Sequence, residues 1–109
     1  MIYNIIAVPS FKKELKKLAK KYPSIKADLA ALFQTLEINP EQGVLLGNNC
    51  YKIRFAISSK NKGKSGGARL ITNFVIADET VYLLSIYDKA DKETLSDKEI
   101  GNLLMEVPK

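Results

Sequence analysis

The chain has 109 residues, 46% hydrophobic and 27% charged, which is typical of one globular domain and excludes a disordered or fibrous chain. One cysteine and no histidine exclude an internal disulfide, a His/Cys metal site and histidine-dependent catalysis, so we expect neither a metal nor a cofactor. Seventeen Lys and Arg against twelve Asp and Glu give a net charge of +5, which favours polyanionic partners such as nucleic acid.

The N-terminal part predicts one strand and two helices. Residues 2–8 form a β-branched run that Pro9 ends, as is typical of a strand. Ser10 is the predicted N-cap of an amphipathic helix that Pro23 ends, and a second helix over 24–36 completes a hairpin. The first helix turns six lysines to one face: Lys12, Lys13, Lys16, Lys17, Lys20 and Lys21. We interpret this face as solvated, with contact to RNA or to an acidic partner as the alternative.

No segment predicts membrane insertion. The apolar start over 1–11 lacks a preceding basic region and a cleavage-like site, and no run approaches the roughly 18 apolar residues of a membrane span. We therefore expect a cytoplasmic protein with no membrane partner.

The C-terminal half predicts three strands and a last helix. The segment 39–49 is rich in Gly, Pro and Asn, which indicates an irregular connection. Ser96 and Glu99 form a capping box that begins the last helix. Between the connection and the last helix, three runs alternate apolar and polar residues as strands do: 51–57, 68–77 and 81–89.

The predicted order is strand, helix, helix, three strands and helix, an α+β fold in a single domain over 1–109. We expect an antiparallel meander with the helical hairpin packed on one face. On the opposite face the alternation gathers five polar side chains: Lys52, Arg54, Arg69, Tyr87 and Lys89. Rigid strands hold planar guanidinium groups well for paired contacts with phosphate, so Arg54 and Arg69, both expected to be exposed, are the strongest candidates for function.

The glycine-rich loop over 60–67 ends like a nucleotide-binding P-loop, but we exclude that function. The P-loop pattern needs a glycine where the chain has Ser58, and it needs a helix where a strand follows. The glycines still let backbone N–H groups approach an anion, and three lysines lie among them: Lys60, Lys62 and Lys64. The loop therefore predicts a phosphate-accepting site, with a flexible, solvated loop as the alternative.

Three segments together resemble the RelE/ParE superfamily of bacterial toxins, and its HigB-like branch most closely: YKIRFAI, GKSGGARLI and VYLLSIYDKADKETLS. The resemblance implies a RelE-like domain with the same order of strands and helices. It also implies the toxin of a type II toxin–antitoxin system, which acts as a ribosome-dependent mRNA endonuclease (mRNA interferase).

The resemblance implies roles for individual residues. Its catalytic set consists of four cations: Lys52, Arg54, Arg69 and Lys89. Further contacts to RNA are expected from five residues of the loop and the cation-bearing strands: Lys60, Lys62, Lys64, Asn73 and Tyr87. Many relatives carry a base-stacking tyrosine near the last helix, and this chain has no aromatic residue after Tyr87. Either Tyr87 takes that role or base stacking is absent.

These residue types suit RNA cleavage by the RNA's own 2′-hydroxyl, which needs a base, charge neutralisation at phosphorus and a donor to the leaving oxygen. Neighbouring cations favour the neutral amine of Lys52, which makes it the candidate base, and Arg54 and Arg69 would stabilise the phosphate. No metal is required. Two alternatives remain: a non-enzymatic toxin of the same fold, like the ParE gyrase inhibitors, and a simple RNA- or ribosome-binding module.

The partners that the resemblance implies are a cognate helix-turn-helix antitoxin, the ribosome and mRNA, and toxin with antitoxin can form a higher-order complex. We expect the antitoxin to cover the face that carries Arg54, Arg69 and Lys89, or to displace the last helix from beside it.

Overall fold

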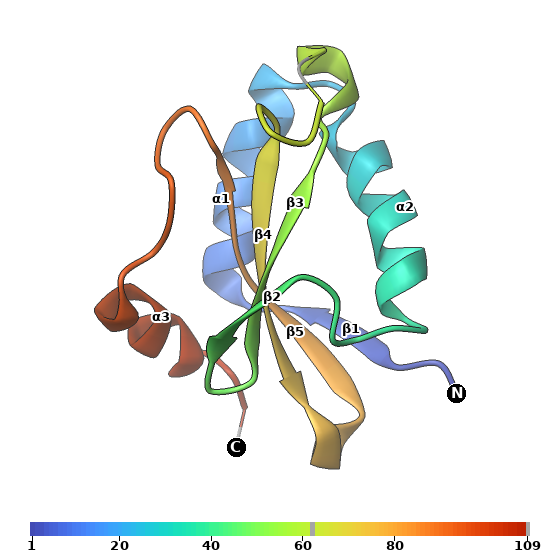
Figure 1. Ribbon diagram of the computed structural model, residues 1–109, viewed down its shortest axis with the longest axis vertical. Coiled ribbons are helices and arrows are strands. Elements are labelled where there is room, and N and C mark those ends of the chain that lie inside the picture. The colour runs from blue at the N-terminus through green and yellow to red at the C-terminus, as the bar shows by residue number, and fades with distance from the viewer. Residues whose placement is uncertain (62, 109) are drawn as a thin grey trace.

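The computed structural model describes residues 1–61 and 63–108. Its strands form one sheet in the order β1-β5-β4-β3-β2, and three helices accompany it (Figure 1). The predicted α+β fold is confirmed. The elements are β1 (Asn4–Ala7), α1 (Pro9–Lys21), α2 (Ile25–Leu36), β2 (Val44–Gly47), β3 (Cys50–Phe55), β4 (Ala68–Val75), β5 (Thr80–Asp88) and α3 (Asp97–Leu104).

The sheet is mixed, because β1 runs parallel to β5 whereas every other neighbouring pair is antiparallel. The predicted meander β3-β4-β5 is confirmed. The segment that we expected to be wholly irregular contains the short edge strand β2, which pairs with β3. Asn48 and Asn49 join the two strands with positive φ angles of 52° and 58°. Such a two-residue turn matches the twist of a hairpin, and Asn adopts this conformation more readily than most residues.

The helix starts follow two different rules. Pro9 occupies the first turn of α1 and Val8 is the N-cap, so the predicted Ser10 cap is wrong. Proline suits this position, because its φ is already helical and its missing N–H has no partner there anyway. The capping box of α3 is confirmed: the Glu99 N–H donates to Ser96 Oγ at 3.1 Å, and the Ser96 N–H donates to Glu99 Oε1 at 3.0 Å.

The core lies between the helical hairpin and the sheet. Figure 1 shows α1 behind β4 and β5, while α3 lies to one side of the sheet at the end of the long segment 89–96. Leu29 and Leu36 of α2 and Leu70 of β4 are almost fully buried, and each such side chain contributes about 2 kcal/mol by leaving water. Within the described residues, no helix combines the length and the apolar composition needed to cross a membrane.

Candidate nucleic-acid interface

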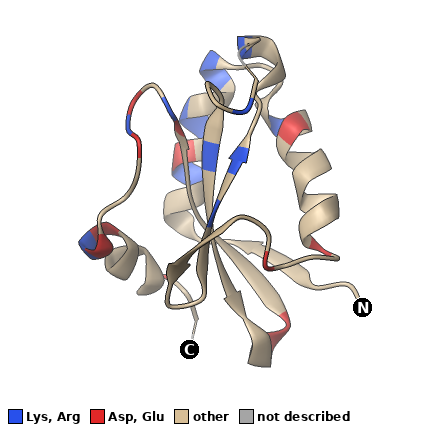
Figure 2. Ribbon diagram, viewed as in Figure 1, with Lys and Arg blue, Asp and Glu red and all other residues tan. Residues whose placement is uncertain are grey.

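Strand register sets three predicted site residues in one row. Arg54 on β3 pairs with Arg69 on β4, and Arg69 pairs in turn with Tyr87 on β5. Lys52 lies two residues before Arg54 and therefore on the same side of β3. In Figure 2, blue segments of β3 and β4 lie beside each other in the middle of the sheet. We call Lys52, Arg54, Arg69 and Tyr87 the cation face.

The members of the cation face differ in exposure. Arg54 is exposed and Lys52 is half-buried, whereas Arg69 is only 2% exposed and Tyr87 4%. The expected exposure of Arg69 is therefore wrong. Tyr87 is covered in part by the segment that follows β5, because the Lys92 Nζ lies 5.6 Å from the centre of its ring. A base cannot stack on that ring face unless Lys92 moves away.

Among the described residues, the buried Arg69 guanidinium donates to three backbone carbonyl oxygens. Nη1 donates to the carbonyls of Lys64 at 3.0 Å and Ala68 at 3.1 Å, and Nη2 donates to the Ser65 carbonyl at 3.3 Å. Nε has no partner, and in the part of the chain that the structure describes no carboxylate lies within salt-bridge distance of this group. A buried charge without a counter-ion is costly, so this site favours an anion.

The second unpartnered polar atom on this row is the Tyr87 hydroxyl. Burial raises the pKa of Tyr87, and the neighbouring Arg69 offsets only part of that increase. The phenol therefore keeps its proton at neutral pH and is available as a hydrogen-bond donor.

The glycine-rich loop over 60–67, which we call the basic loop, is anchored on both sides. At its start, the Asp28 carboxylate accepts bonds from the Ser58 N–H at 2.9 Å and the Ser58 Oγ at 2.6 Å. At its end, a Cβ on Gly67 would lie 2.1 Å from the Phe55 carbonyl oxygen, so only glycine fits against β3. The anchored ends argue against a freely flexible loop. Lys64 is exposed there, and Lys62 lies outside the described residues.

Lys60, which the sequence predicts to contact RNA, forms a partly buried ion pair with the fully buried Asp88. The Lys60 Nζ donates to Asp88 Oδ1 at 2.6 Å, and the Tyr22 hydroxyl donates to Oδ2 at 2.5 Å. Burial alone would raise the pKa of Asp88, but these bonds outweigh it and hold the pKa at about 2. The sequence carried a signal for this cluster, because strand alternation places Asp88 on the buried side with Leu84 and Ile86.

Two further predicted residues have structural contacts. Asn73 is 5% exposed, and its Nδ2 donates to the Asn48 carbonyl at 3.1 Å, so it holds the β2–β3 turn rather than facing solvent. Lys89 follows the end of β5, and its N–H donates to the Gly67 carbonyl at 3.1 Å. The half-buried Lys89 thus fastens the end of the basic loop through its backbone.

The C-terminal segment reaches the start of α1. The Glu106 carboxylate accepts bonds from the Ser10 N–H at 2.9 Å and from the Ser10 Oγ at 2.5 Å. It thereby caps a helix that has no cap of its own and no acidic residue in its first turn. A cavity of about 410 Å³ lies between α1, α3 and β5. No local sequence pattern signals this contact, because the two residues are 96 positions apart.

A search against protein-family models finds no match. Among solved structures, a mutant of the E. coli toxin RelE in the free state matches with a TM-score of 0.64 and 16% identity, over 99% of this chain and 100% of RelE. The chain has the fold of RelE. The isolated E. coli RelE toxin matches with a TM-score of 0.53 and 18% identity, over 96% of this chain and 99% of RelE.

RelE also matches when it is bound to antitoxin. The intact E. coli RelBE toxin–antitoxin complex gives a TM-score of 0.52 at 21% identity, over 79% of this chain and 95% of the matched chain. A RelE mutant in complex with a RelB antitoxin peptide gives a TM-score of 0.52 at 21% identity, over 87% of this chain and 100% of the matched chain. The RelE-like architecture implied by the sequence resemblance is thus confirmed.

Proposed function

We propose that this chain is the toxin of a type II toxin–antitoxin system and that it cleaves mRNA on the ribosome without a metal ion. The observation that carries the proposal is the row of Arg54, Arg69 and Tyr87 across three paired strands, with Lys52 beside it. The RelE fold supports it, because E. coli RelE is itself a toxin with an antitoxin, RelB. Membership of the HigB-like branch stays a prediction.

The row suits a phosphodiester in the act of cleavage. Arg54 meets the phosphate from the surface, while Arg69 supplies an uncompensated charge from beneath, where its effect is least screened by water. Arg69 Nε and the Tyr87 hydroxyl are both free to donate to phosphate oxygens. Full access to Tyr87 requires the segment 89–96 to shift, because Lys92 lies over the Tyr87 ring.

The chemistry is an internal transfer. Lys52 acts as the general base and takes the proton of the 2′-hydroxyl, and the 2′-oxygen attacks the adjacent phosphorus. The bond from phosphorus to the 5′-oxygen breaks, and the Lys89 ammonium gives that oxygen a proton. The products are a 2′,3′-cyclic phosphate and a free 5′-hydroxyl, so no water is consumed in this step. Because no strong base is present, orientation of the mRNA by the ribosome supplies much of the rate.

The proposed partner is a cognate helix-turn-helix antitoxin that covers the cation face or displaces α3. The second mode suits α3, which is docked incompletely. Ile100 is buried, but Leu103 and Leu104 are only half-buried and Met105 is 80% exposed. An antitoxin helix with apolar side chains could take the place of α3 and gain the burial that α3 lacks.

Expression of the chain in a bacterium tests this function. Wild-type protein should arrest growth and translation, co-expression of the neighbouring antitoxin gene should restore growth, and the Arg54→Ala variant should be harmless although equally soluble. Undisturbed growth with soluble wild-type protein present would contradict the proposal. Arrest by Arg54→Ala as well would assign toxicity to another surface.

A further inference from the structure

Helix α1 carries the entire net charge of the protein. Its residues include six lysines and one glutamate, which give +5. The eleven cations and eleven acids in the rest of the chain cancel, since the whole chain has seventeen and twelve. The positive charge of this protein is therefore a local property of one helix.

The fold does little to neutralise that helix. Its lysines form two rows at i, i+4 spacing, in which like charges oppose one another. In the described part of the chain, the sole salt bridge from α1 joins Lys21 to Asp88 at 4.0 Å. Glu14 does not help, because its carboxylate turns to β5 and accepts a bond from Ser85 Oγ at 2.9 Å. The two rows are Lys12, Lys16 and Lys20, and Lys13, Lys17 and Lys21.

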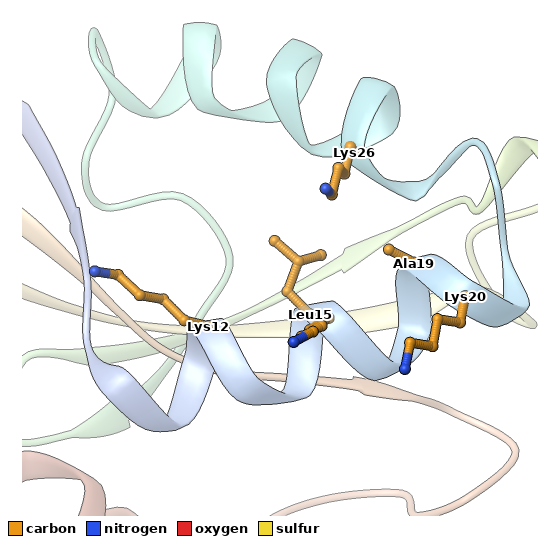
Figure 3. Close-up of a pocket in the computed structure, with 6 residues that line it drawn as sticks. Lys12, Leu15, Ala19, Lys20 and Lys26 are labelled. Carbon is orange, nitrogen blue, oxygen red and sulfur yellow. The ribbon is translucent and has the colours of Figure 1, made fainter.

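The two rows face hollows on opposite flanks of α1. The first row borders a groove of about 350 Å³ between α1 and α2, with Leu15 and Ala19 as its floor. Figure 3 shows Lys26 reaching from α2 toward this groove, which adds a fourth cation to its rim. On the other flank, Lys13 and Lys17 border the cavity between α1 and α3. We call α1 with its two lysine rows the lysine ridge.

We infer that the lysine ridge is a second binding surface, and that its ligand is the sugar–phosphate backbone of folded RNA. An acidic amphipathic helix in the groove would contact the first row and Lys26, and would leave Lys13 and Lys17 unmatched. A nucleic-acid backbone is a continuous polyanion and can engage both flanks at once. Binding of this kind holds and positions the protein without reading sequence.

The ridge and the cation face can act together. Helix α1 lies behind β4 and β5 (Figure 1), and the exposed Arg54 belongs to the row on β3. If the protein acts on the ribosome, as the proposed function states, the RNA at the ridge is ribosomal. The ridge then holds the toxin while the cation face reaches the mRNA. RNA binding by the ridge itself does not depend on cleavage.

A direct test uses the full chain and a 2′-O-methyl RNA duplex of about 16 base pairs, which cannot be cleaved by its own 2′-hydroxyl. Affinity is measured by fluorescence anisotropy as salt is raised. Replacing Lys12, Lys16 and Lys20 by Gln should weaken binding at least about tenfold at roughly 0.1 M salt, and should lower the salt slope by about 0.7 to 0.9 for each phosphate that is no longer neutralised. The double variant Lys13→Gln, Lys17→Gln should lower the salt slope by the same amount for each phosphate that is no longer neutralised.

Two controls separate a local site from general charge. In the first, the triple lysine variant also carries Glu79→Gln, Glu93→Gln and Asp97→Asn, which restore the net charge away from α1; binding should stay weak. In the second, Lys98→Gln, which removes one exposed cation from α3, should bind the duplex within about twofold of wild type. Thermal unfolding of each variant excludes loss of the fold.

Three results would overturn the inference: unchanged binding after either set of lysine changes, recovery of binding when net charge is restored, or an effect of the first row without the second. The last result would point to a peptide in the groove. A wild-type chain that binds the duplex but causes no growth arrest would contradict the toxin proposal alone.

Discussion

The cation face and the lysine ridge are both basic, but they hold their charge in opposite ways. On the sheet, Arg54 and Arg69 are fixed by strand register, and one of the two is almost fully buried. On α1, five of the six lysines have no salt-bridge partner among the described residues, and all six are exposed at the ends of flexible stems.

The two arrangements of charge have different effects on a nucleic acid. A few charges held in a low-dielectric site act strongly on one phosphate, because neither water nor salt screens them well. Many exposed charges attract a polyanion from a distance, but their effect falls as salt rises. Position and burial, more than the number of cations, therefore mark the candidate catalytic site.

The largest expected effect comes from the exposed member of the cation face. Arg54→Ala should slow single-turnover cleavage of ribosome-bound mRNA by about 10³-fold, comparable with the loss of one preorganised donor to a developing oxyanion. Lys16→Ala on the ridge should change that rate by less than about threefold at saturating ribosome, since other lysines remain. Circular dichroism should be unchanged in both. Equal losses would erase the distinction between the two surfaces.

The next effect concerns a cation that does have a counter-ion. Asp88→Asn leaves the partly buried Lys60 without its carboxylate, so the free energy of unfolding in urea should fall by about 3 kcal/mol. Adding Lys60→Met should recover part of that loss, because the unpaired charge is then gone. If Asp88→Asn unfolds at the wild-type urea concentration, the ion pair does not hold the loop.

Acid should weaken the same cluster in wild-type protein. The pKa of Asp88 is lowered from 3.8 to about 2 in the folded state, so its contribution to stability is complete above pH 4 and is lost as pH falls toward 2. The loss amounts to about 2 kcal/mol. Urea unfolding at stepped pH should show this decline in wild type, and a smaller one in Asp88→Asn. Parallel declines in both proteins would assign the acid sensitivity to other carboxyls.

The smallest expected effect concerns the stability of α1, on the lysine ridge. Lys16→Glu replaces like-charge neighbours on the ridge by Glu–Lys pairs with Lys12 and Lys20, and should raise the free energy of unfolding by about 0.5 kcal/mol. The same variant should bind duplex RNA more weakly, which would mean that α1 keeps its charge at the expense of stability. A loss of stability would indicate that Lys16 makes a contact in the folded protein that favours it.

Much of the fold follows from local pattern. Alternation over 51–57 and 81–89 is enough to place strands, and a capping box such as Ser96 with Glu99 is satisfied by residues three apart. The edge strand β2 was missed because its four residues have little pattern of their own and depend on the Asn48–Asn49 turn for pairing.

The sequence predicted the side of the sheet on which the candidate residues lie, but not how deeply each of them is buried. Alternation correctly put Arg54, Arg69 and Tyr87 on one face, since the period of a strand fixes the side. Arg69 is enclosed by the carbonyls of Lys64 and Ser65, and the Tyr87 ring is covered in part by Lys92, and neither contact has a local signal in the sequence. The same holds for Glu106 at the start of α1.

The most direct test of the account is whether purified wild-type protein cuts mRNA that is bound to intact ribosomes, and which ends the cut leaves. We predict cleavage with a 2′,3′-cyclic phosphate on the upstream fragment and a 5′-hydroxyl on the downstream one, and about 10³-fold less product with Arg54→Ala. Intact mRNA after incubation with folded wild-type protein and ribosomes would contradict the proposal that the cation face is a ribonuclease site.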